Sequence, residues 1–220
     1  LDLKYLFLEV QSKIYYNSNR TSSSQFVSNK VLDNIEKYAN STELNKYGAR
    51  FKYSKFLKII DDTHESITSN ITTISMRRDL RVVLNSFAEY SIGFGNAFQV
   101  NKLDGYNIKS SAFRIANLDA DVYLGDFPNV NRSTGTLFLF TVPNVNSTSP
   151  TILKRNVGFI DYVNGIITLN PIVVTSAKSV NGQATIEISA NPRSNDVVGL
   201  QDLYLQLDTT NSIFEMIVDS

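Results

Sequence analysis

The 220-residue sequence contains no cysteine, no tryptophan, a single histidine, His64, and two methionines. Without cysteine the chain cannot supply a thiol nucleophile or a Cys-ligated zinc or iron–sulfur site. A Ser-His-Asp triad would have to use His64. No apolar run approaches the roughly 20 residues that a membrane-spanning helix needs. These absences exclude several enzyme classes and argue against a membrane protein.

A surplus of charge is missing as well, because 21 Lys and Arg balance 21 Asp and Glu. Neutralising nucleic-acid phosphates requires a basic surplus, so a general nucleic-acid binder is not expected. The compact basic cluster is MRRDLR, residues 76–81. On a strand, Arg77 and Arg81 would point to one face and Arg78 to the other, which favours a partner contact over a basic stripe.

The first third of the chain has mixed periodicity. Residues 1–16 are typical of a strand, and β-branched residues from Ser66 onward indicate another. Between them, apolar residues recur at helical spacing over residues 24–40 and 53–62, and a Ser before the first run can cap the helix. The order strand, helix, helix, strand predicts a small α+β unit with helices on one face of a sheet.

From Phe98 onward short strands replace helices. Asn164-Gly165 and Asn181-Gly182 lie between strand-like runs and predict hairpin turns. The fold class is therefore predicted to be α+β and mostly β, with an antiparallel β-rich region after the helical unit. We place the division between residues 1–96 and residues 97–220.

Two polar segments raise the question of chemistry. DDTHE, residues 61–65, is either an acid/base or metal site or the polar loop after a helix, and a lone imidazole favours the loop. Asp119 and Asp121 begin like a calcium loop, but Tyr123 occupies the next ligand position. GFGN, residues 93–96, is typical of a bulge or tight bend rather than a phosphate loop. We predict no catalytic residue, no metal site and no cofactor.

Six stretches carry a resemblance to a known family. They are IYYNSNRTSS (14–23), GARFKYSKFLKIIDDT (48–63), SITSNITTISMRRDL (66–80), NSFAEYSIGFGN (85–96), VGFIDYVNGIITL (157–169) and IEISANPRSNDV (186–197). Together they resemble the C-terminal part of the baseplate wedge protein, gene product six, of T4-like contractile-tailed bacteriophages. The similarity follows most of the chain in order.

This resemblance implies a structural virion component and not an enzyme. Proteins of the family dimerise to join neighbouring wedges into a ring around the hub, and they bind other wedge proteins. The expected location is the tail baseplate of the virion, after assembly in the bacterial host cytoplasm. Because the sequence lacks the family's N-terminal helical segments and begins without Met, we expect a fragment of a longer protein.

The predicted interface is the aromatic stretch Phe87, Tyr90, Phe94 and Phe98, together with Arg77 and Arg78. The alternative interpretation of the aromatic residues is strand positions that pack the core. Two other functions remain open. The chain could be a carbohydrate- or receptor-binding β module of a tail protein, or a glycosidase that uses paired carboxylates.

Overall fold

The computed structural model describes residues 4–21, 23–101, 106–142, 150–200 and 202–219. The chain divides into two compact units. The first combines Leu1–Met76 with Ser194–Ser220, and the second is the continuous segment Arg77–Arg193. The chain therefore leaves the first unit, builds the second, and returns to the first.

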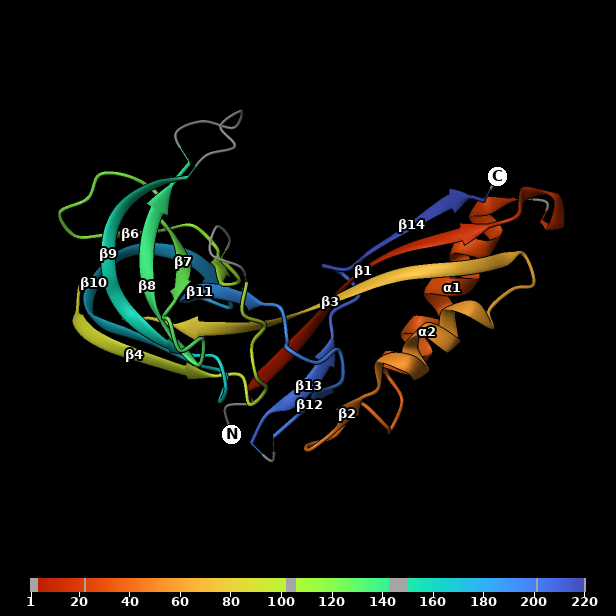
Figure 1. Ribbon diagram of the computed structural model, residues 1–220, viewed down its shortest axis with the longest axis horizontal. Helices are drawn as coiled ribbons and strands as arrows, with labels where there is room; N and C mark the ends of the chain where they lie inside the picture. The colour runs from red at the N-terminus through yellow and green to blue at the C-terminus, as the bar shows by residue number, and fades with distance from the viewer. Residues whose placement is uncertain (1–3, 22, 102–105, 143–149, 201, 220) are drawn as a thin grey trace. The chain divides into compact units, whose positions relative to one another are not determined.

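The first unit contains both helices and the strands around them (Figure 1). Its elements are β1 (Tyr5–Tyr16), a 3-10 turn η1 (Ser18–Arg20), α1 (Ser24–Ala39), β2 (Arg50–Phe51), α2 (Tyr53–Asp61), the first part of β3 (Ile67–Arg81), β12 (Val197–Val198), β13 (Tyr204–Leu207) and β14 (Ile213–Val218).

The two helices begin and end within a residue of the predicted bounds. The Ser23 hydroxyl caps α1 by accepting a hydrogen bond from the Phe26 backbone N–H. One stripe of each helix is buried, with Val27, Val31 and Ile35 in α1 and Phe56 and Ile60 in α2. The two helices lie along one face of the sheet (Figure 1). β1 contributes alternate buried residues to this unit, such as Leu6 and Leu8.

Strands from the distant end of the sequence complete this sheet. β13 and β14 follow one another along one edge of β1, and both pair with it in parallel. β3 lies on the other side of β1. Both strands lie within residues 97–220, for which the sequence predicts an antiparallel region, but their pairing with β1 is parallel. Strand direction depends on where the chain returns, which local sequence does not encode.

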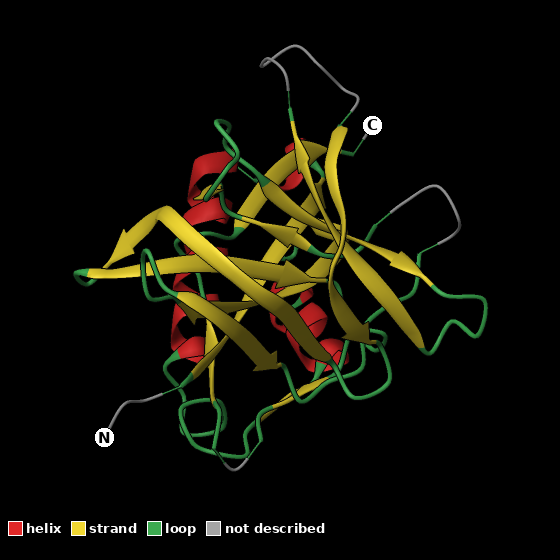
Figure 2. Cartoon of the chain, turned by 90° about the vertical axis from the view of Figure 1, so that its left-hand side faces the viewer, coloured by secondary structure: helices red, strands yellow, loops and turns green. Residues whose placement is uncertain are grey.

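The second unit is built from strands. They are the end of β3, β4 (Phe87–Gly93), β5 (Lys109–Ser110), β6 (Phe113–Ile115), β7 (Tyr123–Pro128), β8 (Thr134–Thr141), β9 (Thr151–Asp161), β10 (Ile166–Val180) and β11 (Gln183–Ala190). The sheet runs in the order β3-β11-β10-β9-β8-β7, with β4 and β6 also pairing with β10 and β5 with β11. The long strands bend around a common core (Figure 1; Figure 2).

Both predicted hairpins are present, but their turns differ. Asn181 and Gly182 alone connect β10 to β11, with φ values of +50° and +78°, as a type I′ turn requires. Asn164-Gly165 closes a wider loop between β9 and β10. There the Asp161 carboxylate accepts hydrogen bonds from the backbone N–H groups of Val163 and Asn164, each at 2.9 Å. The same dipeptide thus serves two loop lengths.

The mostly β fold with antiparallel sheets is confirmed. The strand-helix-helix-strand unit is matched only loosely, because β2 separates the helices and β12, β13 and β14 join the unit from the far end of the sequence. A boundary between residues 96 and 97 stays a prediction about independent folding, while the compact units divide after Met76 and before Ser194.

Candidate interaction surface

Phe94 and Phe98 of the predicted interface are fully buried. Their rings meet edge to face, with centroids 5.0 Å apart. β4 ends at Gly93, and Gly95 has φ +66°, a left-handed conformation that glycine adopts without strain. The chain therefore bends inward at this point. These two aromatic side chains stabilise the core of the second unit, in line with the alternative interpretation of the stretch.

Arg77 and Arg78 lie on β3 and are both more than nine-tenths buried. Arg77 pairs with the carboxylates of Asp79 at 2.7 Å and Glu187 at 3.5 Å. Arg78 donates to the Gly93 carbonyl. Burial raises the pKa of Asp79, and the Arg77 charge opposes that rise. Both guanidinium groups thus bind partners within the second unit.

Phe87 is the residue of the predicted set with a large exposed surface, at 74%. It lies at the start of β4, just after two further exposed apolar residues, Val83 at 64% and Leu84 at 40%. We call Val83, Leu84 and Phe87 the Phe87 segment. Exposed apolar residues that lie together can mark a contact surface, so we take this segment as the candidate.

Hydrogen bonds hold the backbone around the Phe87 segment in place. The N–H groups of Val82 and Asn85 donate to the carbonyls of Ala184 at 2.9 Å and Val174 at 2.8 Å. Tyr90 faces the other side of β4, and its hydroxyl accepts from the Val83 N–H at 3.1 Å. A segment fixed in this way can present apolar side chains without paying much ordering entropy on binding.

An aromatic cluster on β7 and β8 was not predicted from the sequence. The Phe138 ring stacks on Phe127 at 4.4 Å and also meets Tyr106 and Phe140. A side chain at Gly125 would come within 2.4 Å of the Phe138 ring, so this glycine makes room for it. Tyr106, Phe127 and Tyr123 are only half-buried. The cluster could have been found from alternation, because Phe138 and Phe140 share one face of β8.

A buried polar pair lies elsewhere in the second unit. Asp126 is 1% exposed and accepts hydrogen bonds from the Tyr162 hydroxyl and the Ile108 N–H, each at 2.6 Å. Burial raises the pKa of Asp126, although these two donors oppose the rise. Burial and the adjacent carboxylate also raise the pKa of Tyr162. The pair is enclosed by protein, as expected of a structural hydrogen bond.

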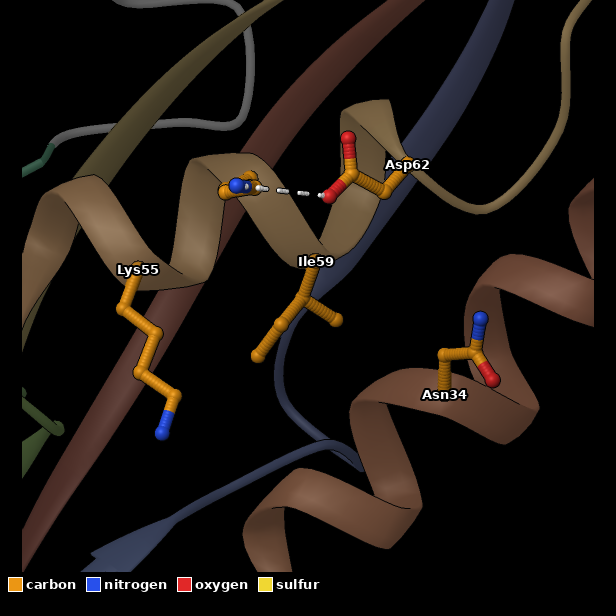
Figure 3. A pocket seen from close by; sticks show the side chains of 5 residues that line it. Asn34, Lys55, Ile59 and Asp62 are labelled. Atoms are coloured by element: carbon orange, nitrogen blue, oxygen red, sulfur yellow. Dashed lines mark ion pairs between the residues drawn. The ribbon is translucent and has the colours of Figure 1, made fainter.

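A shallow groove of about 410 Å³ lies between α1 and α2 (Figure 3). Asn34 lines it from α1, and Ile59 projects from α2 between the two helices. Lys55 pairs with Glu43, and Lys58 lies 4.0 Å from Asp62. Among the residues that line the groove there is neither a nucleophile beside a base nor a pair of facing carboxylates.

The polar segments considered from the sequence have ordinary structural partners. His64 Nδ1 lies 2.8 Å from the Ser66 hydroxyl, and Asp61 accepts from the Asn70 side chain. Asp121 pairs with Arg114 at 2.6 Å. Within the described ranges, no three His, Asp or Glu side chains come together as metal ligands would. Neither helix that the structure describes has the length and apolar content to cross a membrane.

Comparison with known proteins indicates a structural role in a phage tail baseplate. Residues 4–79 match the family model of baseplate structural protein gp6, C-terminal domain III. This match confirms the resemblance over residues 4–79 and supports a gp6-like baseplate wedge protein. The matched residues include β1, both helices and most of β3. No curated protein matches the chain.

Proposed function

We propose that this chain self-associates to join neighbouring baseplate wedges into a ring around the hub, in contact with other wedge proteins. It would do so in the virion tail, after assembly in the host cytoplasm. The family match over residues 4–79 carries the proposal. The family model describes a structural protein, and the groove, His64 and the buried Asp126–Tyr162 pair all have structural explanations.

The proposed contact in the second unit is the Phe87 segment. In a two-fold contact each copy presents the same patch, so one apolar segment contributes to the contact from both copies. Aromatic side chains are enriched among the residues that dominate binding energy. The neutral net charge of the chain lowers long-range repulsion between copies. Of the predicted interface residues, Phe87 would make the contact, whereas Phe94, Phe98, Arg77 and Arg78 are buried within the second unit.

Light scattering coupled to size-exclusion chromatography tests this proposal. The mass of the wild-type chain should rise with concentration from 24.6 kDa toward twice that value. Phe87→Asp should stay monomeric at concentrations where the wild type associates, because an aspartate at the centre of an apolar contact would be desolvated. Val130→Asp is the matched control, since Val130 is also an exposed apolar residue of the second unit. It should associate like the wild type.

A strictly monomeric wild type at every concentration would contradict self-association by this chain. The half-buried rings of Tyr106 and Tyr123 would then favour the second candidate function, a carbohydrate-binding module, because sugars stack on aromatic faces. Isothermal titration calorimetry against a panel of glycans would decide this alternative. Saturable binding that is lost in Tyr123→Ala would support it.

A further inference from the structure

β14 has an unusual composition for its place at a sheet edge. Its sequence is Ile-Phe-Glu-Met-Ile-Val, and none of the six side chains is buried. Ile213 and Val218 are 59% and 53% exposed. Within the described residues β14 pairs with β1 alone, so its second edge carries no strand. An apolar edge strand of this kind is a template for pairing with another chain.

The usual protections of an edge strand are missing from β14. The strand contains no proline and no lysine, and its six consecutive partners on β1 run without a bulge. Its one charge, Glu215, lies directly opposite Lys13 of β1. Opposite charges that face one another across a strand pair attract. Because Lys13 balances its charge, Glu215 repels an approaching strand less than an unpaired carboxylate would.

The backbone of β14 determines which residues an added strand would bind. The Asp219 N–H donates to the Tyr16 carbonyl at 2.8 Å. Because successive backbone groups of a strand point to opposite sides, Ile213, Glu215 and Ile217 also direct their N–H and C=O groups toward β1. The groups of Phe214, Met216 and Val218 therefore point to the free edge.

We propose that a second copy of this chain adds its own β14 antiparallel to this edge, with Met216 on the two-fold axis. Phe214 then lies opposite Val218 of the second copy, and the two Met216 residues lie opposite one another. All three residues have outward backbone groups, so each opposed pair can exchange two hydrogen bonds. On the face away from the helices, Glu215 meets Ile217 of the second copy.

Charge selects this register over its neighbour. Sliding the strands by two residues would centre the axis on Glu215, and the two carboxylates would then lie directly opposite one another. Sliding the other way would centre the axis on Ile217 and shorten the overlap. A slide by one residue would place backbone groups that point to the free edge opposite groups that point toward β1, so they could not form hydrogen bonds with one another. The Met216 register combines the longest overlap with a Glu215 that keeps Lys13 as its neighbour.

This inference rests on the proposed function, because both require self-association, but it assigns a different surface from the Phe87 segment. A contact between two six-residue strands is small compared with stable interfaces, which bury about 1,200–2,000 Å². Pairing through β14 alone is thus expected to be weak. Covalent trapping is therefore a more sensitive test than chromatography.

The absence of cysteine makes trapping clean, because an introduced thiol is unique. Glu215→Cys and Ile217→Cys would be prepared as separate proteins, since residues 215 and 217 form the non-hydrogen-bonded pair, in which side chains approach closely enough for a disulfide. Under mild oxidation Ile217→Cys alone, which keeps Glu215, should not form a disulfide dimer. An equal mixture of the two proteins should form the disulfide. About half of the randomly formed dimers would contain one copy of each variant and would place Cys at position 215 opposite Cys at position 217.

Dimers from Ile217→Cys alone would overturn the register, because this variant keeps Glu215 and such dimers would place the axis on residue 217. A mixture that gives no more dimer than Thr73→Cys mixed with Ile217→Cys would overturn the inference as a whole. Thr73 is exposed on β3 in the same unit and serves as the collision control. If light scattering still shows dimers in that case, self-association survives and the β14 contact fails. If the wild type is monomeric and no disulfide forms, both fail.

Discussion

At the scale of single residues, the buried pair of Asp126 and Tyr162 is a sensitive point of the second unit. Tyr162→Phe removes the hydroxyl that donates to Asp126 and leaves a carboxylate oxygen buried without that donor. The expected loss of unfolding free energy is about 1–3 kcal/mol, measured by urea denaturation. Tyr90→Phe is the matched control, because its hydroxyl bonds at an exposed site. An equal loss in both variants would contradict a special role for the pair.

The same pair predicts a pH dependence. Burial raises the pKa of Asp126 above its ordinary value of 3.8, so the folded state holds this proton more tightly than the unfolded state. The contribution of Asp126 to stability is then fully present below that ordinary value and is lost as the pH rises through the raised folded pKa. Asp126→Asn does not titrate.

The measurement is the unfolding free energy of wild type minus that of Asp126→Asn across the acid range. This difference should fall as the pH rises above about 4 and then level off. A difference that rises over this range would mean that the hydrogen bonds from Tyr162 and Ile108 outweigh burial.

Residue spacing also explains why the aromatic residues of the predicted interface do not share one face. Phe87 and Tyr90 lie three positions apart, and on a strand an odd spacing puts two side chains on opposite faces. The alternation of β4 could have shown this in advance. The burial of Phe94 and Phe98 could not be predicted in the same way, because it depends on the bend at Gly95 after the strand ends.

At the scale of elements, the β10–β11 hairpin depends on a glycine. Gly182 has φ +78°, which an L side chain adopts only with strain, although no atom lies within 4 Å of where its Cβ would be. Gly182→Ala should therefore cost about 1–2 kcal/mol of unfolding free energy through backbone strain alone. Gly93→Ala is the control, because that site is equally open and its φ is not positive.

Helices and hairpins were predictable because their signals are local. The spacing of Val27, Val31 and Ile35 defines α1 within a few turns, and Asn181-Gly182 specifies its own turn. β2 is too short to carry a periodic signal. The parallel pairing of β13 and β14 with β1 was beyond local inference, since it depends on the chain's return after the whole second unit.

At the scale of the whole molecule, the first unit needs the strands that follow the second. Deleting residues 209–220 removes β14 and leaves β13 in place. The β1 amides of Ser12, Ile14 and Tyr16 point toward β14 and should then exchange hydrogen at least about tenfold faster. The amides of Gln11 and Lys13 point to the other side and should stay protected.

Hydrogen exchange followed by mass spectrometry or NMR makes this measurement residue by residue. The strands of the second unit serve as an internal control, because they form a separate compact unit. Acceleration spread evenly over both units would indicate that the deletion unfolds the whole chain rather than freeing one edge.

The pairing of β14 with β1 also sets an order of events during synthesis. Val10 and Ser212 are hydrogen-bonded although 202 positions separate them, so β1 leaves the ribosome long before its partner is translated. The second unit, continuous in sequence, can fold in that interval. A nascent or truncated chain would lack the β14 edge, and only chains translated past this strand could take part in an assembly that uses it. Completion of translation would thus determine which copies can join the assembly.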